Sequence, residues 1–249
     1  MELPDERLLA TMPLHAITST YGEDGLRLRF ATEIAGFGDA DRERLERALE
    51  LAARLHAGDR RQREPYVNHL LRVAIRIIAY YGVRDADVIC AALLHDAVED
   101  HPGELAPGGG QQGGGEQGGV QRAALAELAS QFGPRVADLV GAVTNPEPVP
   151  GQDRHQQYLE HVADSLAASP WARVIKASDF TDNGVGLIHT TGARMERLAG
   201  KYEPVVPVLR ELITRPDTPL SEAAKARILG QLDQAAERFS IIREAAQPG

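Results

Sequence analysis

The sequence contains a single cysteine, Cys90, among its 249 residues, so no disulfide can form within the chain. Cys90 lies in the apolar stretch VICAALL, which predicts a buried thiol rather than a reactive one. No apolar run approaches the roughly 18 residues that a membrane-spanning helix needs. The acidic N-terminal stretch MELPDERLLATMPLHA also lacks the long apolar core of a signal peptide. We therefore expect a cytoplasmic protein.

An excess of positive charge is missing as well. The formal net charge is −9, and charged residues make up 25% of the sequence. A protein that coats nucleic acid or an anionic membrane is usually basic, so we expect neither partner. Hydrophobic residues make up 43% of the chain, which is enough for one sizeable core or two small ones. The sequence leaves the oligomeric state open.

Alternating strand patterns are almost absent. One short stretch, LRLRFA at 26–31, alternates like a strand inside an irregular N-terminal segment. From residue 39 onward, apolar residues recur at spacings of three and four, which is typical of amphipathic helices. Pro65 suits a first helical turn, and Gly82 suits a helix stop. We predict helices over 39–56, 64–82 and 84–100, two within 121–145, two within 153–190, and two more near 202–214 and 219–245.

These patterns predict an all-α protein that forms a single domain over residues 1–249. Its core is expected at about 40–190, followed by a C-terminal helical extension at 200–249. The stretch PGGGQQGGGEQGG at 107–119 is rich in glycine and glutamine and has no side chains to pack. We interpret it as a flexible loop insertion rather than a domain boundary, because helical patterns resume directly after it.

Six ionisable side chains are candidates for chemistry: His69, His95, Asp96, Glu99, Asp100 and Asp179. Four of them stand in the stretch LLHDAVED at 93–100. Helix positions four apart lie on nearly one face, so His95 should lie near Glu99, and Asp96 near Asp100. Two imidazoles and two carboxylates, from His69, His95, Asp96 and Asp179, would suit Mn²⁺, Fe²⁺, Zn²⁺ or Mg²⁺. The mixed nitrogen and oxygen donors favour Mn²⁺, and a bound ion would activate water and polarise a phosphoryl oxygen.

Each of these residues also has a structural interpretation. His69 alone could be a core histidine, and Asp179 alone could cap a helix or lie on the surface. Glu99 and Asp100 could be the solvated end of a helix. The basic cluster RRQR at 60–63 could be a solvated loop, although its position just before His69 also suits phosphate binding.

The ordered set of motifs resembles the HD-domain metal-dependent phosphohydrolases. Within them, it is most similar to the hydrolase domain of the RelA/SpoT family and to the small, single-domain alarmone hydrolases. The resemblance covers roughly residues 45–187. It rests on LAARLHAGDRRQREPYVNHLLRVA, DADVICAALLHDAVED, FGPRVADLVGAVTN and VIKASDFTDN.

The resemblance implies an all-α HD-domain fold and a role for each candidate. The implied metal ligands are His69, His95, Asp96 and Asp179. Glu99 and Asp100 would assist the attacking water. Arg61 would pack beside the base and Asn183 would line the nucleotide site, while Arg60, Arg61 and Arg63 together suit the phosphates of a small nucleotide.

The implied activity is hydrolysis of guanosine tetra- or pentaphosphate at the 3′ position, with release of pyrophosphate. The sequence differs from the family at Phe180, where a basic residue is usual, and at Gly184 to Gly186. Two alternatives therefore stay open. The first is another nucleotide phosphohydrolase on the same fold, acting on a nucleoside monophosphate, a dNTP or NADPH. The second is a non-catalytic nucleotide sensor or an antitoxin-like binding module.

Overall fold

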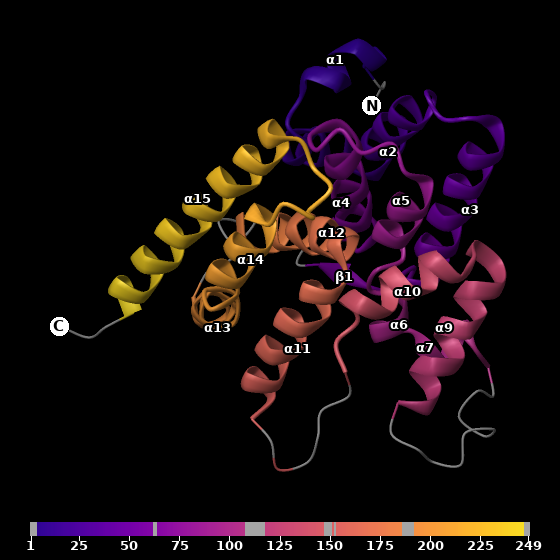
Figure 1. The fold of residues 1–249 in the computed structure, drawn as a ribbon. Helices are drawn as coiled ribbons and strands as arrows, with labels where there is room; N and C mark the ends of the chain where they lie inside the picture. Colours follow the sequence, from indigo (N-terminus) through magenta and orange to yellow (C-terminus); the bar gives the residue numbers. More distant parts are fainter. Residues whose placement is uncertain are drawn as a thin grey trace. The chain divides into compact units, whose positions relative to one another are not determined.

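The computed structural model describes residues 4–61, 64–107, 118–146, 151, 153–185 and 192–246, and helices dominate it (Figure 1). The prediction of an all-α fold is confirmed. Among the described residues the one sheet is a pair of antiparallel two-residue strands, in which Arg60 faces Pro65 and Arg61 faces Glu64. Most of the glycine-rich insertion expected at 107–119 lies outside the described residues. No helix in the described part of the chain combines the length and apolar character needed to cross a membrane.

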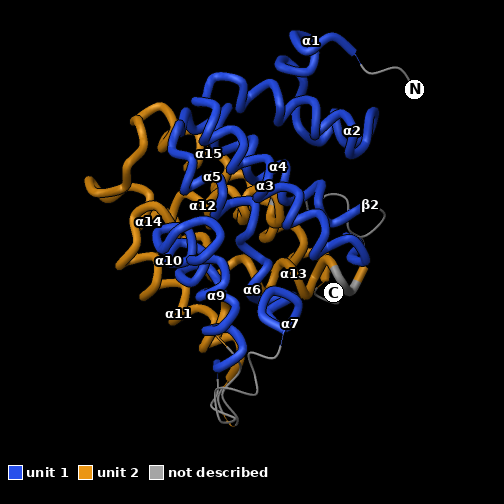
Figure 2. Tube along the Cα trace, turned by 90° about the vertical axis from the view of Figure 1, so that its right-hand side faces the viewer, with its two compact units in different colours: residues 1–144 blue, residues 145–249 orange. Residues whose placement is uncertain are grey.

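The chain divides into two compact units, residues 1–144 and residues 145–249 (Figure 2). The single domain expected over 1–249 stays a prediction. The elements of the first unit are α1 (Glu6–Thr11), α2 (Leu14–Ile34), α3 (Asp39–Leu55), β1 (Arg60–Arg61), β2 (Glu64–Pro65), α4 (Val67–Ala79), α5 (Ala86–Leu93), α6 (Ala97–Asp100), α7 (Pro102–Leu105), α9 (Gly119–Phe132) and α10 (Pro134–Val143). Those of the second unit are α11 (Arg154–Ala168), α12 (Pro170–Phe180), the π-helix η1 (Thr181–Val185), α13 (Ala193–Tyr202), α14 (Val205–Thr214) and α15 (Glu222–Ala246).

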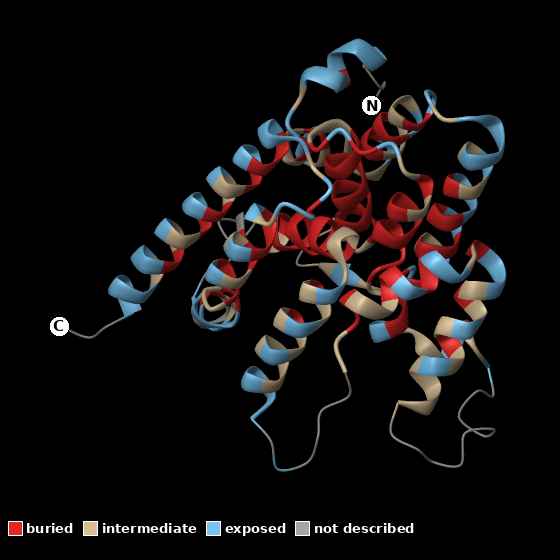
Figure 3. Ribbon diagram, viewed as in Figure 1, coloured by how far each residue is buried: buried red, intermediate tan, exposed pale blue. Residues whose placement is uncertain are grey.

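Helices α4 and α5 form the centre of the first unit. Helix α4 packs on α2 and α5, and α5 packs in addition on α3 and α10. Every residue of α4 from Val67 to Ile78 is buried, as is every residue of α5 except Asp87, and Figure 3 shows both helices largely in red. Gly82 adopts a φ of 72° just after α4, as the expected helix stop requires. The polar residues of α4 therefore lie inside the unit rather than on its surface.

A buried ion pair fixes the short sheet to α4. Arg72 is 3% exposed, and its two terminal nitrogens donate to the two carboxylate oxygens of Glu64 at 3.0 and 2.8 Å. Asn68 donates to the same carboxylate at 3.1 Å, and Arg72 also donates to Thr18 of α2 at 3.2 Å. Such a paired fork satisfies the buried guanidinium. Pro65 consequently lies in β2 and not in the first turn of α4, so that prediction is wrong.

The N-terminal segment is not irregular, and its strand-like stretch at 26–31 forms no strand, because these residues belong to α2. The apolar residues Leu26 and Phe30 are four apart, and both are buried on one face of the helix. Arg29 lies between them in sequence and is buried too, since it pairs with Glu33 one turn later and donates to the carbonyl of Leu9. Arginines that are satisfied by local partners made an amphipathic helix resemble an alternating strand.

In the second unit, α12 packs on α11 and α14, and α15 packs on α13, α14 and η1. The helices predicted after residue 153 are confirmed as α11, α12, α14 and α15, and α13 is a further helix that was not predicted. Arg173 of α12 is fully buried. Its guanidinium donates to both carboxylate oxygens of Asp217 at 2.7 and 3.0 Å and to the hydroxyl of Thr218 at 2.9 Å. These bonds hold α12 to the segment that precedes α15.

Candidate metal centre

The stretch LLHDAVED does not form one continuous helix. Helix α5 ends at Leu93, Leu94 to Asp96 form a turn, and the short helix α6 begins at Ala97. The prediction of a single helix over 84–100 is therefore wrong, because the turn at Leu94 to Asp96 interrupts it. The turn brings the side chains of His95 and Asp96 together, with Nε2 of His95 3.1 Å from Oδ2 of Asp96. Neighbours in sequence on a regular helix would diverge by about 100°.

His69 reaches the same place from α4. Its ring lies 5.3 Å from the ring of His95, centroid to centroid, and a nitrogen of one ring lies within 4.8 Å of a nitrogen of the other. Nε2 of His69 is 3.6 Å from Oδ2 of Asp96. The two imidazoles are buried, whereas the Asp96 side chain is 20% exposed. The first unit thus gathers three of the four predicted metal ligands around one carboxylate oxygen.

The hydrogen bonds of His95 show that this arrangement suits a cation. Nδ1 of His95 lies 2.8 Å from the carbonyl oxygen of Ala92, and a carbonyl can only accept, so Nδ1 carries a hydrogen. In neutral His95 the lone pair of Nε2 then points toward the carboxylate of Asp96. Two electron-rich atoms at 3.1 Å are stable together only with a positive charge between or beside them. A proton or a divalent metal ion meets this requirement, and the donor set fits the metal.

Tyr66 supports this centre, although sequence reasoning did not select it. Its hydroxyl donates to Oδ2 of Asp96 at 2.7 Å, and its ring lies edge-on to His69. On its other side the ring stacks on His56 at a centroid distance of 4.6 Å. Burial, followed by the negative charge of Asp96, raises the pKa of Tyr66, so the phenol keeps its proton. Its place three residues before His69 in PYVNH was the signal that could have identified it.

Glu99 and Asp100 lie on α6, directly after the ligand pair, and both are exposed. One side of Asp100 is nevertheless shielded from water. This partial desolvation, together with the charges of Asp96 and Glu99, raises the pKa of the Asp100 carboxyl to about 6. At neutral pH Asp100 is a carboxylate that binds a proton more readily than an ordinary aspartate does.

The basic cluster lies on β1 and on the residues after it. The guanidinium carbon of Arg61 lies 5.3 Å from the centroid of the Tyr66 ring, which places this cation beside the tyrosine that contacts Asp96. Arg60 is exposed. Arg63 falls outside the described residues, so its predicted role is not tested.

Asp179 and Asn183 belong to the second unit. Asp179 is buried near the end of α12, where it accepts a hydrogen bond from Lys176 at 3.1 Å and another from the amide of Asn183. Asn183 lies on the π-helix η1, a rare geometry that often accompanies functional residues. The predicted spacing of Asp179 and Asn183 thus produces a direct contact between them.

The structure also explains two departures from the family pattern. Phe180 is buried, and its ring lies edge-on to the rings of Tyr202 and Phe239. A β-carbon at Gly184 would come within 3.3 Å of the Phe180 ring and 3.4 Å of the Phe239 ring. Glycine at this position therefore accommodates the aromatic packing of Phe180 in the second unit.

Comparisons with known proteins agree with the motifs. The sequence profile of the HD domain matches residues 48–174. The chain is 33% identical over 138 residues to "Guanosine-3′,5′-bis(diphosphate) 3′-pyrophosphohydrolase MESH1" of Drosophila melanogaster, a match that covers 54% of this chain and 64% of that protein. It is also 33% identical over 135 residues to MESH1 of Danio rerio, covering 53% of this chain and 62% of that protein. The chain thus spans less than two thirds of these relatives' length.

A solved structure is similar as well. It is described as "A metazoan ortholog of SpoT hydrolyzes ppGpp and plays a role in starvation responses". The likeness has a TM-score of 0.57 at 27% sequence identity, and it covers 78% of this chain and 94% of that one. Among bacterial proteins, "Guanosine-3′,5′-bis(diphosphate) 3′-pyrophosphohydrolase" of Aquifex aeolicus is 30% identical over 142 residues, which are 57% of this chain and 17% of that protein.

Proposed function

The chain belongs to the HD domain family, and from this premise we propose that it is a divalent-metal-dependent phosphohydrolase. The proposed substrate is guanosine tetra- or pentaphosphate, cleaved at the 3′ position with release of pyrophosphate. The observation that carries the proposal is the Asp96 carboxylate, which lies beside the buried imidazoles of His69 and His95 at 3.6 and 3.1 Å. The names of the similar proteins support the choice of substrate.

The proposed ligands are His69, His95 and Asp96, with Asp179 as a further ligand on the strength of its motif. When bound, a divalent ion, with Mn²⁺ as the proposed species, supplies a Lewis acid for a phosphoryl oxygen and a more acidic water. His95 is held for this role by its bond to Ala92, which keeps the lone pair of Nε2 available. Tyr66 holds the Asp96 carboxylate from the other side.

Glu99 and Asp100 are the proposed acceptors of the proton that leaves the attacking water. Asp100 suits this task because a carboxyl with a pKa of about 6 is ionised at neutral pH and still takes up a proton readily. Arg61 would hold the nucleotide, with Arg60 and Arg63 beside its phosphates and Asn183 lining the site. We propose a small nucleotide in the cytoplasm as the partner, and neither a nucleic acid polymer nor a membrane, in line with the net charge of −9.

The test is an assay of purified protein with Mn²⁺ against guanosine tetraphosphate, nucleoside monophosphates, dNTPs and NADPH, with pyrophosphate and phosphate measured separately. We expect pyrophosphate from guanosine tetraphosphate, and none from a His95→Ala variant. Phosphate from the other nucleotides, with no pyrophosphate from guanosine tetraphosphate, would contradict the proposed substrate. Tight nucleotide binding without turnover would contradict the proposed enzyme.

The role of Arg61 is tested in the same assay. Arg61→Ala should raise KM for guanosine tetraphosphate while the metal content stays unchanged. Arg42→Ala is a matched control, because Arg42 lies near the N-terminal end of α3. At 1.5 Å per helical residue, it is about 20 Å from the C-terminal end of α3, after which β1 and Arg61 follow. Equal KM values for the two variants would remove Arg61 from the binding site.

A further inference from the structure

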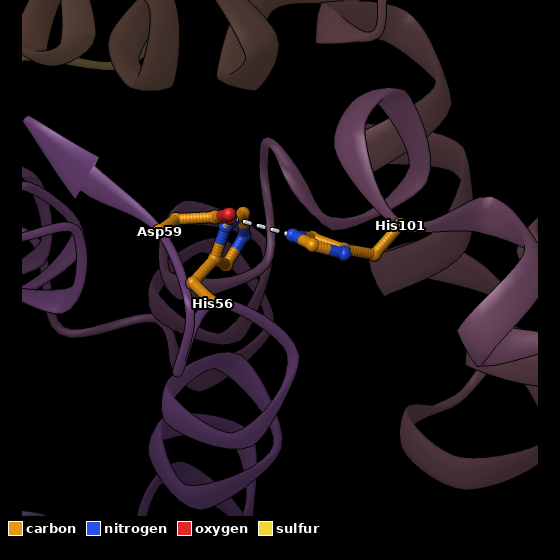
Figure 4. Close-up of side chains that lie close together, drawn as sticks. All are labelled: His56, Asp59 and His101. Atoms are coloured by element: carbon orange, nitrogen blue, oxygen red, sulfur yellow. Dashed lines mark hydrogen bonds and ion pairs between the residues drawn. The ribbon is translucent and has the colours of Figure 1, made fainter.

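A second group of metal-binding side chains lies in the first unit, outside the residues assigned above. It consists of His56, Asp59 and His101, which each offer one donor atom, and these atoms all lie within 4.8 Å of one another. His56 ends α3, Asp59 follows in the turn before β1, and His101 joins α6 to α7. Figure 4 shows the Asp59 carboxylate pointing at both imidazole rings.

The distances within this group are short. Oδ2 of Asp59 lies 2.8 Å from Nδ1 of His56 and 2.6 Å from Nε2 of His101. Hydrogen bonds from both rings hold the pKa of Asp59 below its usual value, so the carboxylate is ionised at neutral pH. Two imidazole nitrogens and one anionic oxygen, converging on one point, make up a common protein ligand set for zinc.

Glu104 hydrogen-bonds to His101, as carboxylates usually do to histidines that bind a metal ion. Its Oε1 lies 2.8 Å from Nδ1 of His101, and a carboxylate can only accept, so Nδ1 of His101 carries a hydrogen. Nε2 of neutral His101 then presents its lone pair to Asp59. As at His95, either a proton on Nε2 or a metal ion must offset two electron-rich atoms this close together, here at 2.6 Å; with the proton, His101 is an imidazolium that donates to Asp59. A carboxylate, a histidine and a metal in this order form a recurrent arrangement.

The exposure of the three side chains and the separations of their donor atoms also suit a metal ion. The Asp59 side chain is 37% exposed and the His101 side chain is 14% exposed, whereas the His56 ring is fully buried. Around a tetrahedral ion with bonds of about 2.0–2.1 Å, donor atoms lie roughly 3.3 Å apart. The present 2.6–2.8 Å separations would have to widen by about half an ångström. Asp59 lies in a turn at the surface, where a rotation of its side chain can supply this movement.

We propose that His56, Asp59 and His101 form a second divalent-cation site, of the kind that Zn²⁺ occupies, with water completing the coordination. This site is distinct from the centre at Asp96. The Tyr66 ring separates the two, since one face of it stacks on His56 while its hydroxyl bonds to Asp96.

The experiment measures metal content. Protein is stripped with a chelator, incubated with Zn²⁺, passed through a desalting column and analysed for zinc per chain. We expect two ions per chain in the wild type and one in His101→Ala. Asp59→Asn should also bind one, since it keeps the side-chain volume and removes the anionic donor. His155→Ala, which changes an exposed histidine of α11, is the matched control and should still bind two.

A second comparison separates this proposal from the proposed function. His95→Ala should lose the ion at the Asp96 centre and keep the one at His101, and the double variant His95→Ala/His101→Ala should bind none. Circular dichroism verifies that each variant stays helical. Equal zinc content in the wild type, His101→Ala and Asp59→Asn would mean that the three residues form a hydrogen-bonded cluster only, and would overturn the proposal. Loss of both ions from either of these folded variants would contradict a separate site.

Discussion

The hydroxyl of Tyr66 donates a 2.7 Å hydrogen bond to the same oxygen of Asp96 that lies nearest to His95. This bond orients a proposed metal ligand from outside the ligand set. Partners of this kind typically contribute 10- to 100-fold to metal affinity. We predict that Tyr66→Phe weakens Mn²⁺ binding by roughly 10-fold or more, measured by competition with a chelator.

Tyr21→Phe is the control for this variant, because Tyr21 lies on α2 and removal of its hydroxyl leaves Asp96 untouched. Both variants should keep the helical circular dichroism of the wild type. If Tyr66→Phe bound Mn²⁺ as tightly as Tyr21→Phe, Tyr66 would have no part in positioning the ligand.

Glu99 is exposed on α6, so its replacement should leave the fold intact. We predict that Glu99→Gln retains metal and lowers kcat by about 10²- to 10⁴-fold, the usual contribution of a group that moves a proton. Glu46→Gln removes a charge from an exposed position on α3 and should keep the wild-type kcat. An unchanged kcat in Glu99→Gln would make Glu99 a solvated helix end.

Asp85 caps α5 by accepting hydrogen bonds from the backbone N–H groups of Asp87 and Val88. Arg135 donates to both of its carboxylate oxygens, at 2.9 and 2.6 Å. We predict that Asp85→Ala lowers the free energy of unfolding at pH 7 by about 1 kcal/mol, the typical value of an N-cap. Urea titrations measure the difference.

The contribution of Asp85 to the free energy of unfolding should also depend on pH. Partial burial alone would raise the pKa of Asp85, but the bonds from Arg135 and the two backbone groups lower it below 3.8. A lowered carboxyl pKa contributes stability that is present above the unfolded value and is lost as the pH falls through the folded value. The difference between wild type and Asp85→Ala should therefore shrink below pH 4. Urea titrations of both proteins over this pH range measure the difference.

Cys90 is fully buried in α5, and burial raises the pKa of its thiol to about 12. Since the thiolate is the reactive form, the native protein should react slowly with a thiol reagent at pH 8. Complete labelling should follow only after denaturation, as measured by absorbance. Rapid labelling of the native protein would mean that α5 opens to solvent far more often than a buried central helix should.

Much of the fold could be predicted, because the spacing of apolar residues along the sequence matches the buried face of each helix. Helices α3 and α15 have regular apolar stripes, and their predicted ranges agree with the structure to within a few residues. The pattern failed at Arg29, because this arginine is buried although its side chain is charged, so its residue type does not reveal its burial. It failed again at Leu94 to Asp96, since a turn of three residues leaves no periodicity to detect.

The candidate site could be predicted in part from motif spacing. His69, His95 and Asp96 were selected as residues that bind one ion, and the first unit gathers them around the Asp96 oxygen. Tyr66 and His101 were not selected, because each acts through a partner far along the chain. The hydroxyl of Tyr66 meets a carboxylate 30 residues later, and His101 meets one 42 residues earlier. Such pairings depend on the fold, which local spacing does not encode.

Arg173 limits how much of the chain can be removed. Its guanidinium is buried and depends on Asp217 and Thr218 as well as on the carbonyls of Leu166 and Ala167. A truncated chain that ended before Asp217 would leave this charge without its acidic partner inside the unit. Removing one partner of a buried pair costs roughly 3–5 kcal/mol, which is a large fraction of a domain's stability.

The profile of the HD domain stops at residue 174, yet α12 continues to Asp179 and Phe180. The Phe180 ring packs edge-on against Phe239 of α15, at a centroid distance of 6.4 Å. Helix α15, which lies beyond the matched residues, thus supports the end of the helix that carries Asp179. A transplant of this domain into another protein would have to include α15 to deliver Asp179 on a folded helix.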